Sequence, residues 1–130
     1  MNYLDAISLR MGRRLPLILQ TEATECGLAC LAMIAGFHGH HATLMDLRRQ
    51  FSVSLKGSTL KQLIQAADQL NLGTRAVRLE LEDLGKLKLP CVLHWNFNHF
   101  IVLKAVENQQ IIVHDPASGI RHPAFELGRS

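Results

Sequence analysis

The sequence lacks the features that mark secreted and membrane-spanning proteins. Its three cysteines are too few and odd in number for the disulfide framework of a small secreted protein. The first 14 residues carry charges along their length and no apolar run that ends in small residues, which excludes a signal peptide. The longest apolar stretch, residues 27–37, is far shorter than the roughly 20 residues that cross a bilayer. We therefore expect a chain that is soluble as it stands and lies in a reducing compartment.

Charge excess, repeats and nucleotide motifs are also sparse. Fourteen Lys and Arg against eleven Asp and Glu give a net charge of +3, too small an excess to indicate a nucleic-acid partner. Arg48 and Arg49 could suggest a nucleic-acid-binding site, but a position on the solvent-exposed face of a short helix explains them more simply. No GxxxxGK[ST] loop is present, so any ATP site lies outside this chain. The length of 130 residues and the apolar fraction of 48% suit one globular domain.

The first half of the chain has the periodicity of helices. Three helices are expected, over residues 25–37, 43–50 and 59–70. Thr24 and Thr43 are suited to cap the first two, because a hydroxyl group can accept from the N–H groups that a first turn leaves unpaired. The first helix is apolar nearly all round, which is typical of a buried helix. The third has one apolar stripe and a stop, formed by Leu60, Leu63, Ile64 and Ala67 and by Asn71 and Gly73.

The second half has the periodicity and composition of β-strands. Strands are expected over residues 74–81, 90–97, 100–106 and 111–114. Residues 107–110 suit a hairpin turn between the last two strands, and residues 116–119 suit another turn. Helices followed by antiparallel strands indicate an α+β fold rather than the alternation of a parallel sheet.

Cys26 is the strongest candidate for a nucleophile. It lies in the first turn of the buried helix, where the N–H groups of a helix start and the helix dipole favour a thiolate. The adjacent Gly27 would let a substrate backbone approach without meeting a side chain. A lone cysteine is more often a small buried hydrophobe. We keep that interpretation for Cys91 and for Cys30, which lies one helical turn further in and faces the core.

A nucleophilic cysteine needs a base, and the base needs an orienting group. If residues 107–110 form a hairpin turn, His99 at the start of one strand comes within about two positions of Asp115 at the end of the other. Opposed residues lie roughly 5 Å apart in such a ladder, so an imidazole–carboxylate hydrogen bond is within reach. His94 also lies near a strand end and competes as the base, whereas His114 points to the opposite face from Asp115. Spacing alone leaves open whether the thiol meets this pair.

Three histidines, His38, His40 and His41, suggest a metal site that Cys26 and Cys30 could complete. The thiols, however, lie at the other end of the helix. At 1.5 Å per residue, Cys26 and His38 are roughly 18 Å apart, which is too far to share an ion. We therefore expect no metal site.

Six motifs, taken together and in order, resemble a known family. They are residues 20–30, Arg48-Arg49 with Phe51, Gly57-Ser58-Thr59-Leu60, Pro90-Cys91-Val92-Leu93-His94-Trp95, Asn98-His99-Phe100 and His114-Asp115-Pro116-Ala117. Over residues 15–121 the chain resembles the papain-like cysteine peptidase domain at the N-terminus of bacteriocin-processing ABC exporters. The likeness is greatest to the colicin V-type secretion transporters.

This resemblance implies an α+β, papain-like fold with an N-terminal helical lobe and a C-terminal antiparallel β-sheet lobe. Residues 1–130 would form a single peptidase domain of a larger ABC exporter, with residues 1–14 as an N-terminal extension and residues 15–127 as the core. The roles carried over by position are nucleophile for Cys26, general base for His99, orienting group for Asp115 and oxyanion-hole donor for Gln20.

The implied function is a cysteine endopeptidase that removes the leader of a bacteriocin or similar secreted peptide after a Gly-Gly motif, while the attached transporter exports the cargo. The remainder of the leader would dock as an amphipathic helix in a groove away from the cleft. The peptidase domain would need no cofactor, and the transmembrane and nucleotide-binding domains would use ATP. The exporter would be a homodimer in the bacterial inner (cytoplasmic) membrane, with this domain on the cytoplasmic side.

A competing hypothesis is a non-catalytic domain that docks a peptide or toxin for export. It predicts leader binding without thiol-dependent turnover. Some relatives in toxin exporters lack the cysteine and only dock their substrate. This chain keeps Cys26.

Overall fold

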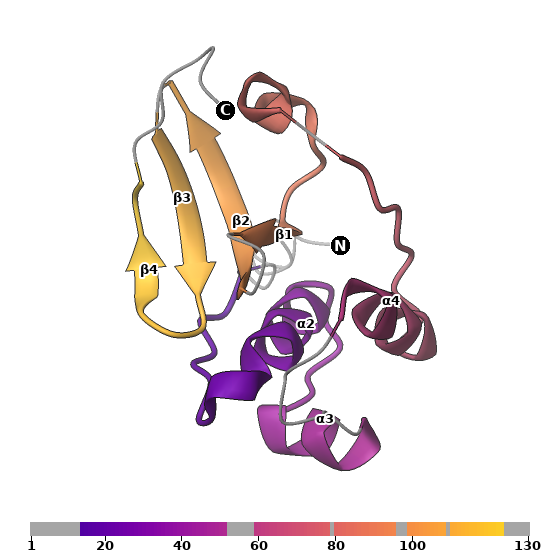
Figure 1. Cartoon of the computed structure of the whole chain (residues 1–130). Helices are drawn as coiled ribbons and strands as arrows, with labels where there is room; N and C mark the ends of the chain where they lie inside the picture. The colour runs from indigo at the N-terminus through magenta and orange to yellow at the C-terminus, as the bar shows by residue number, and fades with distance from the viewer. Residues whose placement is uncertain (1–13, 52–58, 79, 96–98, 109, 124–130) are drawn as a thin grey trace, which may run out of the picture.

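The structure is a computed structural model, and it describes residues 14–51, 59–78, 80–95, 99–108 and 110–123. A helical layer packs against a four-stranded antiparallel sheet (Figure 1). The helices come first in the chain and the strands second, so the predicted α+β order is confirmed.

Several predicted features fall outside these residues. They are the N-terminal extension over 1–13, the motif residues Gly57, Ser58 and Asn98, the predicted strand ends at 79 and 96–97, position 109 of the hairpin turn, and the end of the core over 124–127.

Three α-helices form the helical layer: α2 (Cys26–Phe37), α3 (Leu44–Gln50) and α4 (Leu60–Gln69). Ten of the twelve residues of α2 are buried, because it contacts α3, α4 and the sheet (Figure 1). The apolar side chains on all faces of α2 are therefore in contact with other elements, and the helix is buried as the sequence predicts. Within the described part of the chain, no helix combines the length and the apolar character that a bilayer crossing requires.

Capping boxes start the two outer helices. The Thr43 hydroxyl accepts from the N–H of Asp46 at 3.0 Å, and the Thr59 hydroxyl accepts from the N–H of Gln62 at 3.1 Å. The predicted Thr43 cap is therefore confirmed. The predicted stripe of α4 is wrong at Leu60, which is 43% exposed. The stripe is confirmed at Leu63 and Ala67, which are buried together with Ala66 and Leu70, whereas Ile64 is only partly buried.

The start of α2 also differs from the prediction. A 3-10 turn, η1 (Ala23–Glu25), precedes the helix, and Thr24 lies inside this turn instead of capping α2. Glu25 occupies the N-cap position of α2. Its carboxylate accepts from the backbone N–H groups of Thr21 and Glu22, which holds the chain in the tight turn. The predicted Thr24 cap is therefore wrong, and no side chain takes its place as a hydrogen-bonding cap of α2.

The sheet has the strand order β1-β2-β3-β4, with every neighbouring pair antiparallel. The strands are β1 (Cys91–Trp95), β2 (His99–Glu107), β3 (Gln110–Asp115) and β4 (Gly119–Arg121). Glu107 pairs with Gln110, and Asn108 adopts a left-handed conformation with φ of 43°, as a two-residue hairpin loop requires. The predicted hairpin is confirmed. Strand β4 was not predicted from the sequence. Its three residues are partly exposed and too few to show an alternation of apolar and polar side chains.

The predicted strand over residues 74–81 is wrong. Residues 74–78 are exposed and have no regular secondary structure, and the 3-10 helix η2 (Leu81–Lys86) follows. The alternation of apolar and polar residues over 74–81 has the period of a strand, but a strand also needs a neighbouring strand to pair with. The described sheet ends at β1, so this segment does not extend it.

Strand β2 is buried on both faces of the sheet. On one face, Phe100 and Val102 join the cluster around α2. On the other, Ile101 and Leu103 pack with Leu84 of η2. This central strand, which begins at His99, is therefore held firmly against the helix that begins at Cys26.

Candidate active site

Cys26 is the first residue of α2, as predicted, and only 7% of its surface is exposed. It packs in the same buried cluster as Phe100 and Val102 of β2. The helix start that carries the thiol therefore lies against the strand that begins with His99. Two segments far apart in the sequence meet here, where the helical layer contacts the sheet.

The predicted histidine–carboxylate pair forms between His99 and Asp115. His99 Nε2 lies 2.6 Å from Asp115 Oδ1. Val102 pairs with His114, which brings the end of β3 beside the start of β2. The side chains of His99 and Asp115 are 28% and 20% exposed, so a substrate can reach them. Because Nε2 faces the carboxylate, Nδ1 is the ring nitrogen left to exchange a proton with a thiol.

Asp115 is set up as a charged group. Burial acts to raise its pKa, but hydrogen bonds from the Ala117 N–H, at 2.9 Å, and from His99 outweigh burial and place the pKa below its usual range. The carboxylate is therefore ionised at neutral pH. It can hold the imidazole in one orientation and stabilise the imidazolium.

Gln20 is held through both its backbone and its side chain. Its N–H donates to the Pro116 carbonyl at 2.9 Å, which attaches it to the turn that follows Asp115. Its side-chain amide donates to the Glu22 carbonyl at 3.1 Å, and Oε1 is buried with no hydrogen-bond partner among the described residues. An amide nitrogen carries two hydrogens, so the group has the capacity for a second acceptor.

An ion pair that the sequence did not predict involves the residue immediately before Cys26, and its acid is buried. Glu25 is 3% exposed, and its Oε2 accepts from Nε of Arg48 on α3. The Arg48 hydrogen bond outweighs the opposing effect of burial and, with bonds from Thr21 and Glu22, lowers the pKa of Glu25 to about 2. A buried acid at the start of a wholly apolar helix needs a cation as its partner. The position of Glu25 in the sequence could therefore have indicated that an ion pair forms there. Arg48 therefore has a specific partner rather than only the expected solvated face.

The other two cysteines are packing residues, as predicted. Cys30 is fully buried one turn behind Cys26, and burial, with the charges of Cys26 and Asp115, raises its pKa well above the usual range. Cys91 is partly buried against the sheet core, and burial raises its pKa to about 11. The three cysteines, all among the described residues, form no disulfide.

Two other histidines lie on the same strands or beside them, with different surroundings. His114 is buried, with Nδ1 2.9 Å from the Pro16 carbonyl, and burial lowers its pKa. It is therefore a packing residue, one of the two non-catalytic roles predicted for it. His94, the competing base, is exposed and stacks on Phe100 with ring centroids 4.4 Å apart. In the described ranges, no three His, Cys, Asp or Glu side chains are grouped to hold a metal ion.

Gly27 has a different role from the expected one. A Cβ atom at this position would lie 2.8 Å from Cδ2 of Leu63, closer than real contacts allow. Gly27 is buried, and its missing side chain lets α4 pack against the first turn of α2. The interpretation of this glycine as an opening for substrate is wrong, because helix packing already occupies the space.

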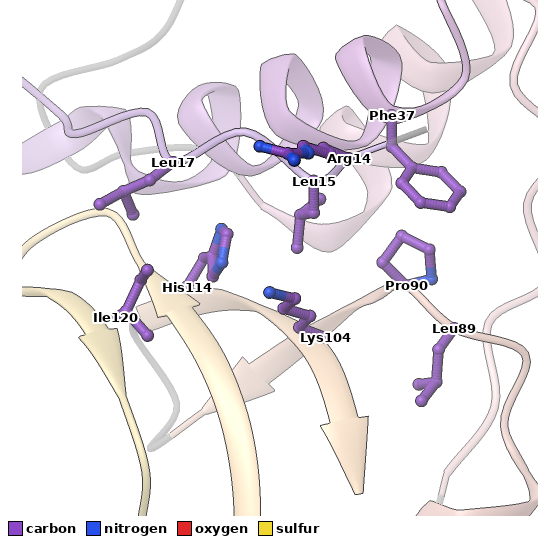
Figure 2. A pocket seen from close by; sticks show the side chains of 9 residues that line it. All are labelled: Arg14, Leu15, Leu17, Phe37, Leu89, Pro90, Lys104, His114 and Ile120. Carbon is purple, nitrogen blue, oxygen red and sulfur yellow. The ribbon is translucent and has the colours of Figure 1, made fainter. Parts of the chain in front are cut away.

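An apolar hollow lies apart from Cys26, His99 and Asp115. Figure 2 shows it between the N-terminal segment, the end of α2 and the sheet. Its volume is about 610 Å³. Its walls are formed by Leu15, Leu17, Phe37, Leu89, Pro90 and Ile120 together with Arg14, Lys104 and His114. Leu17 and Ile120 are 40% and 50% exposed. Two large apolar side chains thus face solvent at one hollow.

Comparison with known proteins matches a family model described as the peptidase C39 family to residues 14–124. The colicin V secretion/processing ATP-binding protein CvaB of Escherichia coli is 50% identical over 123 residues, covering 95% of this chain and 18% of that protein. The probable microcin-H47 secretion/processing ATP-binding protein MchF of Escherichia coli is 49% identical over 126 residues, covering 97% and 18%. The chain thus spans less than a fifth of the length of these curated relatives.

Solved structures share the fold. The crystal structure of a double glycine motif protease from an AMS/PCAT transporter, in complex with the leader peptide, is 37% identical with a TM-score of 0.80, covering 86% of this chain and 81% of that chain. The peptidase domain of Streptococcus ComA, a bi-functional ABC transporter, is 24% identical with a TM-score of 0.77, covering 85% and 87%. At that identity ComA supports the fold alone. The predicted peptidase fold is confirmed.

Proposed function

The chain belongs to the peptidase C39 family of cysteine peptidases, and we propose that it cleaves the leader of a bacteriocin or similar secreted peptide after a Gly-Gly motif. The observation that carries the proposal is the His99–Asp115 hydrogen bond at the strand that packs against the Cys26 helix. The relatives support the substrate class, since two are secretion/processing proteins and one solved structure contains a leader peptide.

Cys26, His99 and Asp115 act as nucleophile, base and orienting group. His99 Nδ1 takes the thiol proton as Cys26 Sγ bonds to the carbonyl carbon of the second glycine, and Asp115 stabilises the imidazolium. The imidazolium then protonates the amine of the cargo, which leaves, and the leader stays attached to Cys26 as a thioester. Water, deprotonated by His99, attacks this thioester, releases the leader carboxylate and restores the thiol.

Gln20 and the Cys26 backbone donate to the oxyanion that forms during both steps. Such donors commonly contribute about 3 kcal/mol each. The position of Gln20 supports this role, because its backbone is bonded to the turn after Asp115 and its side chain reaches the carbonyl of Glu22, next to the helix start. The amide keeps a hydrogen for a second acceptor.

Specificity would arise at two places. A narrow cleft admits only substrates without side chains at the two positions before the cut. The remainder of the leader, as an amphipathic helix, would dock by its apolar face in the hollow of Figure 2. The exposed Leu17 and Ile120 at this hollow support the assignment.

The proposal includes the setting of the domain. Residues 1–130 are taken as one peptidase domain, with a core over 15–127, of a longer ABC exporter whose transmembrane and nucleotide-binding domains use ATP. The names of the relatives support this setting. The exporter is proposed to be a homodimer in the bacterial inner membrane, with the peptidase on the cytoplasmic side and no cofactor of its own.

The test is cleavage of a double-glycine precursor by the Cys26→Ala variant. We expect cleavage to be abolished and leader binding to remain nearly unchanged, because the variant loses the nucleophile and little volume. Cys91→Ala is the matched control and should keep full activity. Cleaved product from Cys26→Ala would refute the assignment.

The competing function, a non-catalytic docking domain, predicts that the unmodified chain also binds leader without turnover. A panel of leader peptides, with the Gly-Gly pair substituted in one member, separates the two functions. Cleavage confined to the Gly-Gly members supports the peptidase, and binding with no cleavage of any member supports docking.

A further inference from the structure

The carboxylate of Glu25 belongs to the residue immediately before the nucleophile, and it accepts four hydrogen bonds. Oε1 accepts from the Thr21 N–H at 3.2 Å, the Thr21 hydroxyl at 2.7 Å and the Glu22 N–H at 3.0 Å. Oε2 accepts from Nε of Arg48. A carboxylate with this many donors is held in one position.

Arg48 closes these contacts into a ring. Its Nη2 donates to the Thr21 hydroxyl at 2.7 Å, and that hydroxyl donates to Glu25. The side chain of Glu25 is only 4% exposed, whereas that of Arg48 is 42% exposed. The guanidinium of Arg48 therefore lies between the Glu25 carboxylate and the solvent. The ring ties the segment between Gln20 and Cys26 to α3, which is 23 residues further along the chain.

The charge of Glu25 also bears on the thiol. A buried carboxylate beside Cys26 would disfavour a thiolate, because like charges repel strongly where water is excluded. Arg48 supplies the compensating cation, and Glu22 is a second acid within its electrostatic reach. One turn further in, Cys30 lies within the electrostatic reach of Cys26 and Asp115. The Arg48 guanidinium therefore offsets two acids, Glu25 and Glu22.

We propose that the Glu25–Arg48 pair is a positioning device for the nucleophile. It fixes the turn that carries Gln20 and Cys26 against α3, and it neutralises the carboxylate of the residue that precedes Cys26 in the chain. Neither side chain is assigned a contact with substrate, so both are positioning residues. The inference deepens the proposed function, on which its cleavage readout rests, whereas its alkylation readout needs no substrate.

The first experiment is the pH profile of alkylation by iodoacetamide, in which Sγ displaces iodide and forms a thioether. Cys26→Ala supplies the background from Cys30 and Cys91. We expect Arg48→Ala to move the profile to higher pH, with roughly tenfold slower labelling at neutral pH, and Glu25→Gln to move it to lower pH. Shifts of opposite sign report charge, because a general loosening of the fold would move both variants in one direction.

Arg49→Ala is the matched control, since Arg49 is the next residue of α3 and contacts the Met45 sulfur instead of Glu25. Its alkylation profile should equal that of the unmodified chain. Arg48→Lys keeps the charge and should recover most of the labelling rate. Profiles of Arg48→Ala and Glu25→Gln that coincide with Arg49→Ala would overturn the proposal. Should Arg48→Ala not fold, the Glu25→Gln shift alone decides, because this substitution is isosteric.

The second experiment measures kcat and KM on a double-glycine peptide. We expect Arg48→Ala to lower kcat roughly 10- to 100-fold with KM changed less than about threefold, because misplaced reacting groups slow chemistry more than binding. Arg48→Lys should recover kcat only in part, since an ammonium cannot bridge Glu25 and Thr21 in the way a guanidinium does. An unchanged kcat in Arg48→Ala contradicts the proposal. If the unmodified chain cleaves no Gly-Gly peptide while the alkylation shifts hold, the proposed function fails and the positioning pair stands.

Discussion

His99 and Asp115 lie on two strands of one hairpin, whereas Cys26 lies on a helix whose start is held by a residue on another helix. The sheet half of the site is built by backbone pairing, which places the start of β2 beside the end of β3. The helical half depends on side-chain charge, through the bond between Glu25 and Arg48. The register of a hairpin depends on residues that are close in the sequence. The partner of a buried charge depends on how distant segments of the chain pack together.

The two halves should therefore fail in different ways. Substitutions in the sheet half remove a chemical group while the surrounding backbone stays paired. Substitutions of Glu25 and Arg48, in the helical half, change the position and charge of groups that remain present. Kinetic constants and pH dependence distinguish the two kinds of failure.

Apart from loss of the nucleophile itself, the largest effect is expected in the sheet half, at Asp115. Asp115→Ala should lower kcat roughly 10³-fold with little change in KM, because the imidazole loses the carboxylate that orients it and stabilises its charged form. Asp115→Asn should recover part of the loss, since the amide oxygen can still accept from His99 Nε2. Steady-state kinetics on a double-glycine peptide measure both. Equal activities of Asp115→Ala and the unmodified chain would remove Asp115 from the mechanism.

A smaller loss is expected at Gln20, in the helical half. Gln20→Ala should lower kcat roughly 100-fold, the usual cost of one oxyanion donor. Gln110→Ala is the control, because Gln110 is exposed and donates to the His122 carbonyl at the far end of the hairpin. The same peptide assay applies. If the two alanine variants behaved alike, the oxyanion role would be wrong and the helical half would carry only the nucleophile.

The hollow tests a region that belongs to neither half. Ile120→Glu should raise KM for a full leader peptide roughly tenfold and leave kcat unchanged, because a charge replaces apolar docking surface without touching the chemistry. Val77→Glu, at an equally exposed valine outside the hollow, is the matched control. A KM that does not respond to Ile120→Glu would place the docking surface elsewhere.

The smallest effect concerns acid stability and depends on Glu25. Its folded-state pKa of about 2 lies below the usual value of 4.5, so the stabilisation is fully present above pH 4.5 and is lost as the pH falls towards 2. Between pH 5 and pH 3, Tm should fall by roughly 3 °C less in Glu25→Gln than in the unmodified chain. Some acid dependence should remain, because the pKa of Asp115 is also lowered. Parallel Tm curves would show that the ion pair contributes no stability.

The sheet half could be predicted from the sequence because each step was local. The turn at residues 107–110 sets the register, and the register brings His99 to Asp115. The same logic failed over residues 74–81, where the alternation was present and a neighbouring strand was not. Periodicity reports which face of a segment is apolar, and only tertiary structure supplies its hydrogen-bonding partner.

The helical half was predicted less completely. The position of Cys26 at the start of an apolar helix follows from composition, and the structure agrees. The cap did not follow, because Thr24, the predicted cap, lies inside the 3-10 turn that precedes α2. Gly27 was misinterpreted for a similar reason, since the proximity of Leu63 is set by how α4 packs.

One carbonyl group, that of Pro116, joins the two halves. It accepts from the N–H of Gln20, and it directly follows Asp115 in the chain. The connection between β3 and β4 therefore fixes the position of Gln20 as well as reversing the chain. Lengthening this connection would displace both Asp115 and Gln20. The connection between β2 and β3 is at the opposite end of the same hairpin and sets the register of the two strands. Insertions at residues 116–118 are therefore expected to abolish activity, because they move both groups at once.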